Sequence, residues 1–302
     1  MRPIAEAYKD FPILHKEHNG HRVIYLDSGA TAQIPQSVID RVVEHMTQRN
    51  GNPHRGSHIL AIEASEDYEN ARDRVVEFIN AREREEVVFT RNSTESMNLI
   101  AHSYGLHNVK KGDKIVITVA EHHANLVTWQ YVAEQTGATL EYMYLDEHGH
   151  LKDGEINKID ENAKIVAFAH VSNVLGMEFP VKELTEKAHS VGAIVVLDGA
   201  QSTPHKKIDV QALDCDFFVF SGHKMCASQG IGVLYGKREL LEVMPPFLLG
   251  GDMIEYVKEQ TATFNELPYK FEAGTPNADG AVSLHAAIDY LESFGMDAIE
   301  AY

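Results

Sequence analysis

The sequence predicts an α/β protein in which a mainly parallel sheet of seven strands lies between helices. Three observations predict this fold class. Short apolar, β-branched segments alternate with amphipathic helical segments. The strand candidates are apolar throughout, which is typical of strands buried on both faces of a parallel sheet. The 302 residues are 44% hydrophobic and 24% charged, so the chain has the size and composition to bury one large core.

The N-terminal part of the chain departs from this alternation. A short strand is predicted at Val23–Leu26. A helix is predicted to begin at Pro35, because proline is favoured in the first turn of a helix. A longer helix is predicted around Ser65–Asn80.

The alternating part contains the strand candidates and the helices between them. The strand candidates are Glu86–Thr90, Lys114–Val119, Leu140–Leu145, Lys164–His170, Ala193–Asp198, Asp216–Ser221 and Gly232–Tyr235. The helices are predicted at Thr94–Tyr104, Ala124–Gln135 and Val181–Val191. After the last strand, Glu239–Pro268 is predicted to be irregular and Ala281–Ser293 to be helical. No helix stop signal precedes the last residue, Tyr302.

Charge and composition disfavour several classes of partner. The formal net charge is −18, from 45 acidic and 27 basic side chains. Nucleic acid and anionic lipid both require clustered basic residues, so neither is expected as a partner. No apolar segment approaches the ~20 residues needed to cross a bilayer, and no signal-peptide pattern is present. We therefore expect a cytoplasmic protein that does not contact a membrane.

Metal and nucleotide sites are not predicted. The chain has 17 histidines but no metal-binding motif, and its two cysteines, Cys215 and Cys226, are too few for a disulfide framework. Cys215 lies in an apolar segment and is interpreted as a small buried hydrophobe. The glycine-rich segment Gly230–Gly236 misses the dinucleotide-binding spacing and leads into a strand rather than a helix.

Polar residues follow several of the predicted strands, at the edge of the sheet where α/β proteins bind ligands. They lie in the segments Asn92–Glu95, Glu121–Asn125, His170–Asn173, Asp198–Gln201 and Ser221–Lys224. Residues at the carboxyl ends of neighbouring strands are expected to line one pocket.

The most informative of these residues are Asp198 and Lys224, which end successive apolar strands. A poorly hydrated lysine has a lowered pKa and is a good nucleophile toward an aldehyde. A pyridoxal-phosphate enzyme needs such a lysine for a Schiff base, together with a carboxylate beside the pyridine nitrogen. Taken singly, Lys224 also fits a solvated loop residue, and Asp198 fits a turn former or helix cap. Their joint occurrence favours the cofactor site.

Two further segments complete the predicted site. Ser93 and Thr94 stand between a strand and a helix, where helix N–H groups and hydroxyls bind a phosphate. An ordinary helix cap is the alternative for these two residues. His122 and His123 follow another strand, and an imidazole there is suited to stacking on a planar cofactor or to moving protons. Adjacent side chains point in different directions, so at most one of the two faces the ring.

Seven strings together resemble one family, the group II (SUF-type) cysteine desulfurases. These belong to the class V aminotransferase branch of fold-type I pyridoxal-phosphate enzymes, and the resemblance covers essentially the whole chain in order. The strings are Leu26–Ala30, His54–Gly56, Glu121–Asn125, His170–Gly176, Asp198–Ser202, Ser221–Lys224 and Phe271–Pro276. The resemblance implies the large domain of an aspartate-aminotransferase-type transferase.

The resemblance also implies a role for each candidate residue. Lys224 binds the cofactor covalently and later moves protons, and Asp198 pairs with the pyridine nitrogen. The other implied contacts are Gln201 with the ring hydroxyl, His122 with the ring face, Asn173 near ring and substrate, Ser93, Thr94, Ser221 and His223 at the phosphate, and Thr275 at the phosphate of the partner subunit in a homodimer.

The implied reaction converts L-cysteine to L-alanine and passes sulfur, through a persulfide, toward iron–sulfur cluster assembly. A SUF-type sulfur acceptor protein is the implied partner, and selenocysteine lyase activity is common in the group. The resemblance divides the chain into residues 1–30, an N-terminal segment of the small domain, 31–285, the large domain, and 286–302, the start of a C-terminal small domain.

Three departures from the family pattern are visible. The family continues about a hundred residues further, and that part supplies the nucleophilic cysteine and the arginine that binds the substrate carboxylate. Ala227–Gln229 replaces the usual Gly-Pro-Thr, and Leu249–Ile254 has two glycines where three are common. Cys226 is a poor substitute for the nucleophile, because it lies on the loop that anchors the cofactor. We therefore expect a protein that binds the cofactor but has impaired or no desulfurase turnover.

Two other functions remain open from the sequence. One is a different pyridoxal-phosphate enzyme on the same scaffold, such as a selenocysteine or cysteine sulfinate lyase or an aminotransferase. The other is a fragment that binds the cofactor or a partner chain without turnover.

Overall fold

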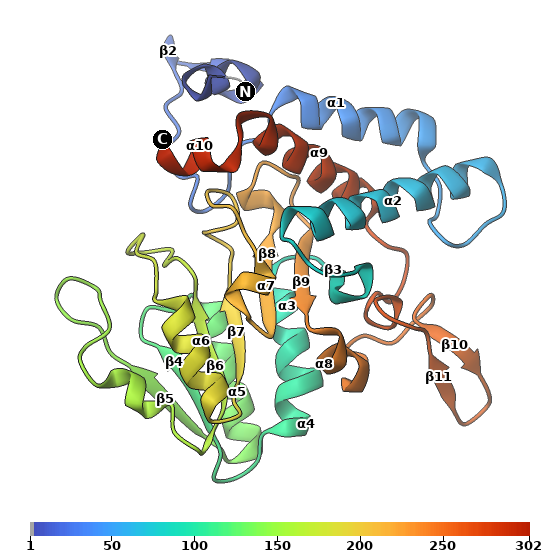
Figure 1. The fold of residues 1–302 in the computed structure, drawn as a ribbon. Coiled ribbons are helices and arrows are strands. Elements are labelled where there is room, and N and C mark those ends of the chain that lie inside the picture. Colours follow the sequence, from blue (N-terminus) through green and yellow to red (C-terminus); the bar gives the residue numbers. More distant parts are fainter. Residues whose placement is uncertain (1–2) are drawn as a thin grey trace.

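A seven-stranded sheet forms the centre of the computed structural model, which describes residues 3–302 (Figure 1). The strand order is β3-β9-β8-β7-β6-β4-β5. The strands are β3 (Val87–Thr90), β4 (Lys114–Thr118), β5 (Thr139–Met143), β6 (Ala163–Ala169), β7 (Ile194–Asp198), β8 (Phe217–Ser221) and β9 (Gly232–Gly236). Strand β9 is antiparallel to both neighbours, and every other pair is parallel. The predicted mainly parallel sheet is confirmed, and each of the seven strands predicted for it is present.

Helices cover both faces of this sheet. They are α1 (Gln36–Glu44), α2 (Ile59–Phe78), α3 (Ser93–Ile100), α4 (Leu106–Asn108), α5 (Val127–Thr136), α6 (Val181–Ser190), α7 (Val210–Leu213), α8 (Arg238–Val243), α9 (Ala278–Phe294) and α10 (Met296–Ala301). One apolar cluster joins the sheet to α1, α2, α6 and α9, and a second joins it to α3, α5 and α8.

Side chains of each strand alternate between these two clusters. In β8, Phe218 and Phe220 contribute to the first cluster, and Phe217 and Val219 contribute to the second. A strand with apolar residues on both faces has no polar side, which explains the continuously apolar strand sequences. Pro35 is the N-cap residue of α1, and the predicted helix Ala281–Ser293 lies within α9.

The prediction of a strand at Val23–Leu26 is wrong. The structure places a two-stranded hairpin just before it, formed by β1 (Glu17–His18) and β2 (His21–Arg22). Ile24 and Leu26 are 78% and 91% exposed, so the apolar side chains that indicated a strand are not packed against a sheet in the described structure.

Two other predicted boundaries need correction. Helix α2 begins at Ile59, before the predicted Ser65, and its N-cap His58 accepts a hydrogen bond from the N–H of Ala61. The first turn exposes Ile59, which obscures the amphipathic pattern. The segment Glu239–Pro268 is not irregular throughout, because it includes most of α8 and the hairpin β10 (Ile254–Val257) and β11 (Ala262–Phe264). Neither strand of that hairpin has a buried face, so no alternation marked it.

Two kinds of feature are absent from residues 3–302. No helix there combines the length and the apolar character that a membrane span requires. No group of three or more histidine, cysteine, aspartate or glutamate side chains there is arranged to hold a metal ion.

Candidate functional site

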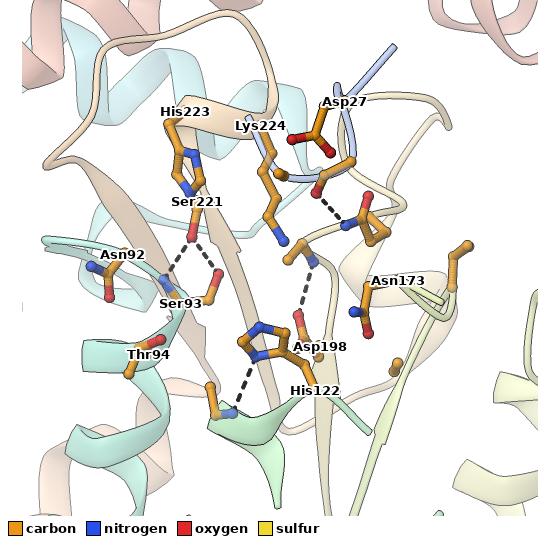
Figure 2. A pocket seen from close by; sticks show the side chains of 17 residues that line it. Asp27, Asn92, Ser93, Thr94, His122, Asn173, Asp198, Ser221, His223 and Lys224 are labelled. Carbon is orange, nitrogen blue, oxygen red and sulfur yellow. Dashed lines mark hydrogen bonds between the residues drawn. The ribbon is translucent and has the colours of Figure 1, made fainter. Parts of the chain in front are cut away.

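A cavity of about 570 Å³ opens beyond the carboxyl ends of the central parallel strands. It brings together nine of the ten predicted site residues: Ser93, Thr94, His122, Asn173, Asp198, Gln201, Ser221, His223 and Lys224. Figure 2 shows the hydroxyl-bearing residues and His223 on one side, and Asp198, Asn173 and the Lys224 amine on the other. The cavity therefore has two chemically different ends.

The hydroxyl end is built by the turn between β3 and α3. The N–H of Ser93 donates to Ser221 Oγ at 2.9 Å, and the two hydroxyl oxygens lie 2.7 Å apart. Asn92, not Ser93 or Thr94, caps α3, since its side chain accepts from the N–H of Glu95 at 3.0 Å. The helix-cap alternative for Ser93 and Thr94 is thus taken by Asn92, and Thr94 faces the cavity (Figure 2). Hydroxyls beside a helix N-terminus suit an anion.

Gly232, the first residue of β9, permits this turn to lie close to the sheet. A Cβ atom on Gly232 would stand 2.5 Å from the Cα of Asn92, well inside contact distance. Any larger side chain would push the turn and its hydroxyls away from the cavity.

The other end is defined by Asp198 and Lys224. Asp198 ends β7 and is 6% exposed, and it accepts from the N–H of Ala200 at 2.9 Å. Burial raises the pKa of Asp198, against the opposing effect of that hydrogen bond and of the Lys224 charge. Burial lowers the pKa of Lys224, and the Asp198 carboxylate partly restores it. The two groups are therefore close enough to interact, and the lysine is biased toward the unprotonated, nucleophilic amine.

His122 lies beside Asp198 in the cavity, and His123 does not line it (Figure 2). The His122 Nδ1 accepts from the N–H of Ala124 at 3.1 Å, so in the neutral ring the proton is on Nε2. Burial lowers the pKa of His122, which favours that neutral ring.

Asn173 and Gln201 reach the cavity from the loops after β6 and β7. Asn173 is exposed and points into the cavity (Figure 2). The amide nitrogen of Gln201 donates to the carbonyl of Gly29 at 2.8 Å, which ties it to the N-terminal segment.

Thr275 is the one predicted site residue outside this cavity. It is exposed, and its neighbours Gly274 and Pro276 line a separate pocket of about 270 Å³. The resemblance assigned Thr275 to the site of a partner subunit, and that assignment stays a prediction.

The prediction missed the wall formed by Asp27, Gly29 and Ala30. This segment follows no strand of the sheet, so the rule that ligand-binding residues follow strands does not predict it. It is shaped by contacts to backbone carbonyls: the Tyr25 hydroxyl oxygen lies 2.6 Å from the carbonyl oxygen of Thr31, to which it donates, and 3.0 Å from that of Asp27. The string Leu26–Ala30, noted for its resemblance, was the signal available.

Neither cysteine is placed for catalysis. Cys215 is fully buried, as predicted, and burial raises its pKa. Burial raises the pKa of Cys226 to about 12, and its side chain lines an adjacent, largely apolar cavity of about 290 Å³. A thiol that ionises so weakly is a poor nucleophile.

The cavity fits pyridoxal phosphate. One end offers hydroxyls and a helix N-terminus to a phosphate. The other offers a buried carboxylate to a protonated ring nitrogen and an amine of lowered pKa to an aldehyde.

Comparisons with known proteins agree with this chemistry. Residues 24–302 match the model of the family described as aminotransferase class-V. A probable cysteine desulfurase of Halalkalibacterium halodurans is 52% identical, over 98% of this chain and 73% of its own. A cysteine desulfurase of Haloferax volcanii is 48% identical, over 97% of this chain and 72% of its own. The solved apo structure of a cysteine desulfurase from Thermococcus onnurineus has a TM-score of 0.92 and 42% identity, over 98% of this chain and 72% of its own.

Proposed function

The chain belongs to the aminotransferase class-V family, and from that premise we propose that it acts as a pyridoxal-phosphate-dependent cysteine desulfurase, forming L-alanine from L-cysteine. One observation carries the proposal: Asp198 and Lys224, from the ends of neighbouring strands, line one cavity and shift each other's pKa.

The bound cofactor supplies an electron-withdrawing ring that stabilises negative charge on the substrate. Asp198 keeps the ring nitrogen protonated, because its buried carboxylate favours a neighbouring positive charge. Lys224 would bind the cofactor through its amine, and the same amine would move a proton at the substrate Cα. His122 covers the ring face, and its neutral imidazole adds no second positive charge to the site.

The remaining candidates orient the cofactor and the substrate. The phosphate is held by Ser93, Thr94, Ser221 and His223. Gln201 contacts the ring hydroxyl, and Asn173 lies near the substrate. Thr275 of the partner subunit reaches the phosphate in a homodimer, which we include in the proposal because Thr275 is exposed on its own chain.

Sulfur transfer needs a thiol as acceptor. In a balanced reaction, L-cysteine and a thiol give L-alanine and a persulfide. Cys215 is buried and Cys226 is half-buried, and both thiols have a raised pKa, so neither suits this role. An acceptor thiol outside these 302 residues is therefore part of the proposal, with a SUF-type acceptor protein and iron–sulfur cluster assembly as destination. Selenocysteine is proposed as a second substrate, and the cytoplasm as the location.

The division of the chain into domains is part of the same proposal. Residues 31–285 form the large, cofactor-binding domain, and residues 1–30 and 286–302 belong to a small domain. The matched relatives are longer than this chain, which spans 71–74% of them.

The test is alanine formation from two substrates by the 302-residue chain loaded with pyridoxal phosphate. Cysteine sulfinate, with water, gives alanine and sulfite, and it needs no thiol acceptor. We expect alanine from the sulfinate, little or none from L-cysteine alone, and loss of both in Lys224→Ala. Alanine from L-cysteine should increase when a small dithiol is added as acceptor.

Other outcomes contradict the proposal. Transfer of the amino group to a keto acid, without sulfur release, indicates an aminotransferase. Cofactor binding with no product from any of these substrates indicates a non-catalytic chain. A persulfide found on Cys215 or Cys226 after turnover of L-cysteine contradicts the conclusion that these two thiols are unsuited as acceptors.

A further inference from the structure

Thr31 is hydrogen-bonded to His223, a residue 192 positions away in the sequence. The Thr31 hydroxyl donates to the carbonyl of His223 at 3.1 Å, and its oxygen lies 3.1 Å from His223 Nδ1. The N–H of Ala32 donates to the same carbonyl at 2.8 Å. The N-terminal segment is thus joined to the turn Gly222–Lys224, which carries the cofactor lysine.

Together these contacts favour one tautomer of His223. Both are satisfied when Thr31 gives its single hydroxyl proton to the carbonyl and its oxygen accepts from Nδ1. The Nδ1–H of His223 is therefore directed at Thr31, and Nε2 is the ring nitrogen left for the cavity that His223 lines.

The charge of the ring follows from this arrangement. Burial and the neighbouring Lys224 both lower the pKa of His223, so the ring is neutral when no anion is nearby. A phosphate at the hydroxyl end of the cavity favours the imidazolium, whose Nε2–H can donate to it. The hydrogen bond to Thr31 holds the ring in the orientation that this donation requires.

We propose that Thr31 is a positioning residue for the phosphate end of the site, acting through the Nδ1 of His223. The proposal rests on the proposed cofactor site but adds a residue that lies outside the cavity. The hydrogen bonds of the Thr31 side chain go to His223, and none of them goes to the side chain of Asp198 or Lys224. Removal of the Thr31 hydroxyl should therefore affect recognition of the phosphate and spare recognition of the rest of the cofactor.

Pyridoxal, which lacks the phosphate, separates these two effects. The purified 302-residue apoprotein is titrated with pyridoxal phosphate and with pyridoxal, and binding is followed by the visible absorption of the lysine-bound aldehyde. Thr31→Val keeps the shape and removes the hydroxyl. We expect about tenfold weaker binding of pyridoxal phosphate, the usual effect of losing one hydrogen bond to a charged group. Pyridoxal binding should change less than about twofold, because the phosphate contact is absent.

Two variants control this experiment. Thr31→Ser keeps the hydroxyl and should bind both aldehydes as the unmodified protein does. Thr136→Val removes another half-buried threonine hydroxyl, which donates to the carbonyl of Val132 at 2.8 Å. Thr136 does not line the cavity, so this variant should bind pyridoxal phosphate and pyridoxal as the unmodified protein does.

Several results would overturn the proposal. Equal weakening of the binding of both aldehydes in Thr31→Val would mark a general structural role. Unchanged binding of both aldehydes in Thr31→Val would also contradict the proposal, as would a Thr31→Ser variant that behaves like Thr31→Val. Failure of the proposed function looks different, because the unmodified protein would then bind neither aldehyde at Lys224.

Discussion

Glu272→Gln is expected to destabilise the fold strongly, because Glu272 is the acceptor at the centre of a buried network. One carboxylate oxygen accepts from Arg72 Nη1 and from the N–H of Phe89, each at 2.7 Å. The other accepts from the Tyr68 hydroxyl at 2.8 Å and from Arg72 Nη2 at 2.9 Å. Arg72 also donates to the carbonyl of Val87 at 2.8 Å. The pair thereby satisfies backbone groups on the outer edge of β3, the strand that leads into the hydroxyl end of the cavity.

The magnitude follows from these contacts. A glutamine has one acceptor oxygen, so its NH₂ group would face two donors that then lose their partner. Arg72 is fully buried, and it would keep only the Glu69 carboxylate, at 3.0 Å from its Nε, as a counter-charge. Removing one partner of a buried ion pair costs about 3–5 kcal/mol of folding stability. Because Glu69 remains beside Arg72, we expect the free energy of unfolding to fall by about 3 kcal/mol, at the lower end of this range.

Denaturant unfolding of the apoprotein measures this loss. The single tryptophan, Trp129, is fully buried and serves as a fluorescence probe beside circular dichroism. The control is Glu66→Gln, on the same helix α2 as Arg72, where the Glu66 carboxylate is 59% exposed and 3.5 Å from Arg49 Nη2. The free energy of unfolding of Glu66→Gln should fall by less than about 1 kcal/mol. If Glu272→Gln loses no more than Glu66→Gln at an unchanged denaturant slope, the reasoning from the buried network is refuted.

Three further predictions concern titratable groups. Burial lowers the pKa of Lys224, so the rate of cofactor incorporation should rise with pH around a midpoint below the ordinary lysine pKa. Asp198→Asn removes the charge that raises the pKa of Lys224 and should lower that midpoint further. Borohydride trapping at a series of pH values measures the midpoint, and an unshifted profile contradicts the prediction. Burial raises the pKa of Glu121 from 4.5 to about 8, so between these values the unfolded chain loses a proton that the folded chain keeps, and stability falls as pH rises. Glu121→Gln should remove this part of the pH dependence of unfolding, and an identical slope in both proteins contradicts it. Cys215 and Cys226 should react with an aromatic disulfide reagent only after unfolding, so rapid labelling of the native chain is the contrary result.

Much of the cavity was predictable because the sheet itself brings its residues together. Asp198 and Lys224 follow neighbouring parallel strands, β7 and β8, whose carboxyl ends lie at one edge. A strand is recognisable from its apolar residues, so the residue after it can be placed without knowledge of side-chain contacts. The same rule placed Ser93, Thr94 and His122 correctly in the cavity.

The rest depended on contacts that local sequence patterns do not encode. The exposed Ile24 and Leu26 suggested a strand, although the chain there is held by hydroxyl and carbonyl contacts of Tyr25 and Thr31 instead. The contact between Thr31 and His223 joins residues that are close only after folding. The hairpin β10–β11 was missed because it is exposed on both faces and therefore has no apolar alternation.

Borohydride reduction of the cofactor-loaded protein, followed by proteolysis and mass spectrometry, tests the central claim most directly. The reduced cofactor should be found on the peptide that contains Lys224 and should be absent from Lys224→Ala. Label on a different lysine, or no label on a protein that is folded and saturated with the cofactor, would contradict the assignment of this cavity.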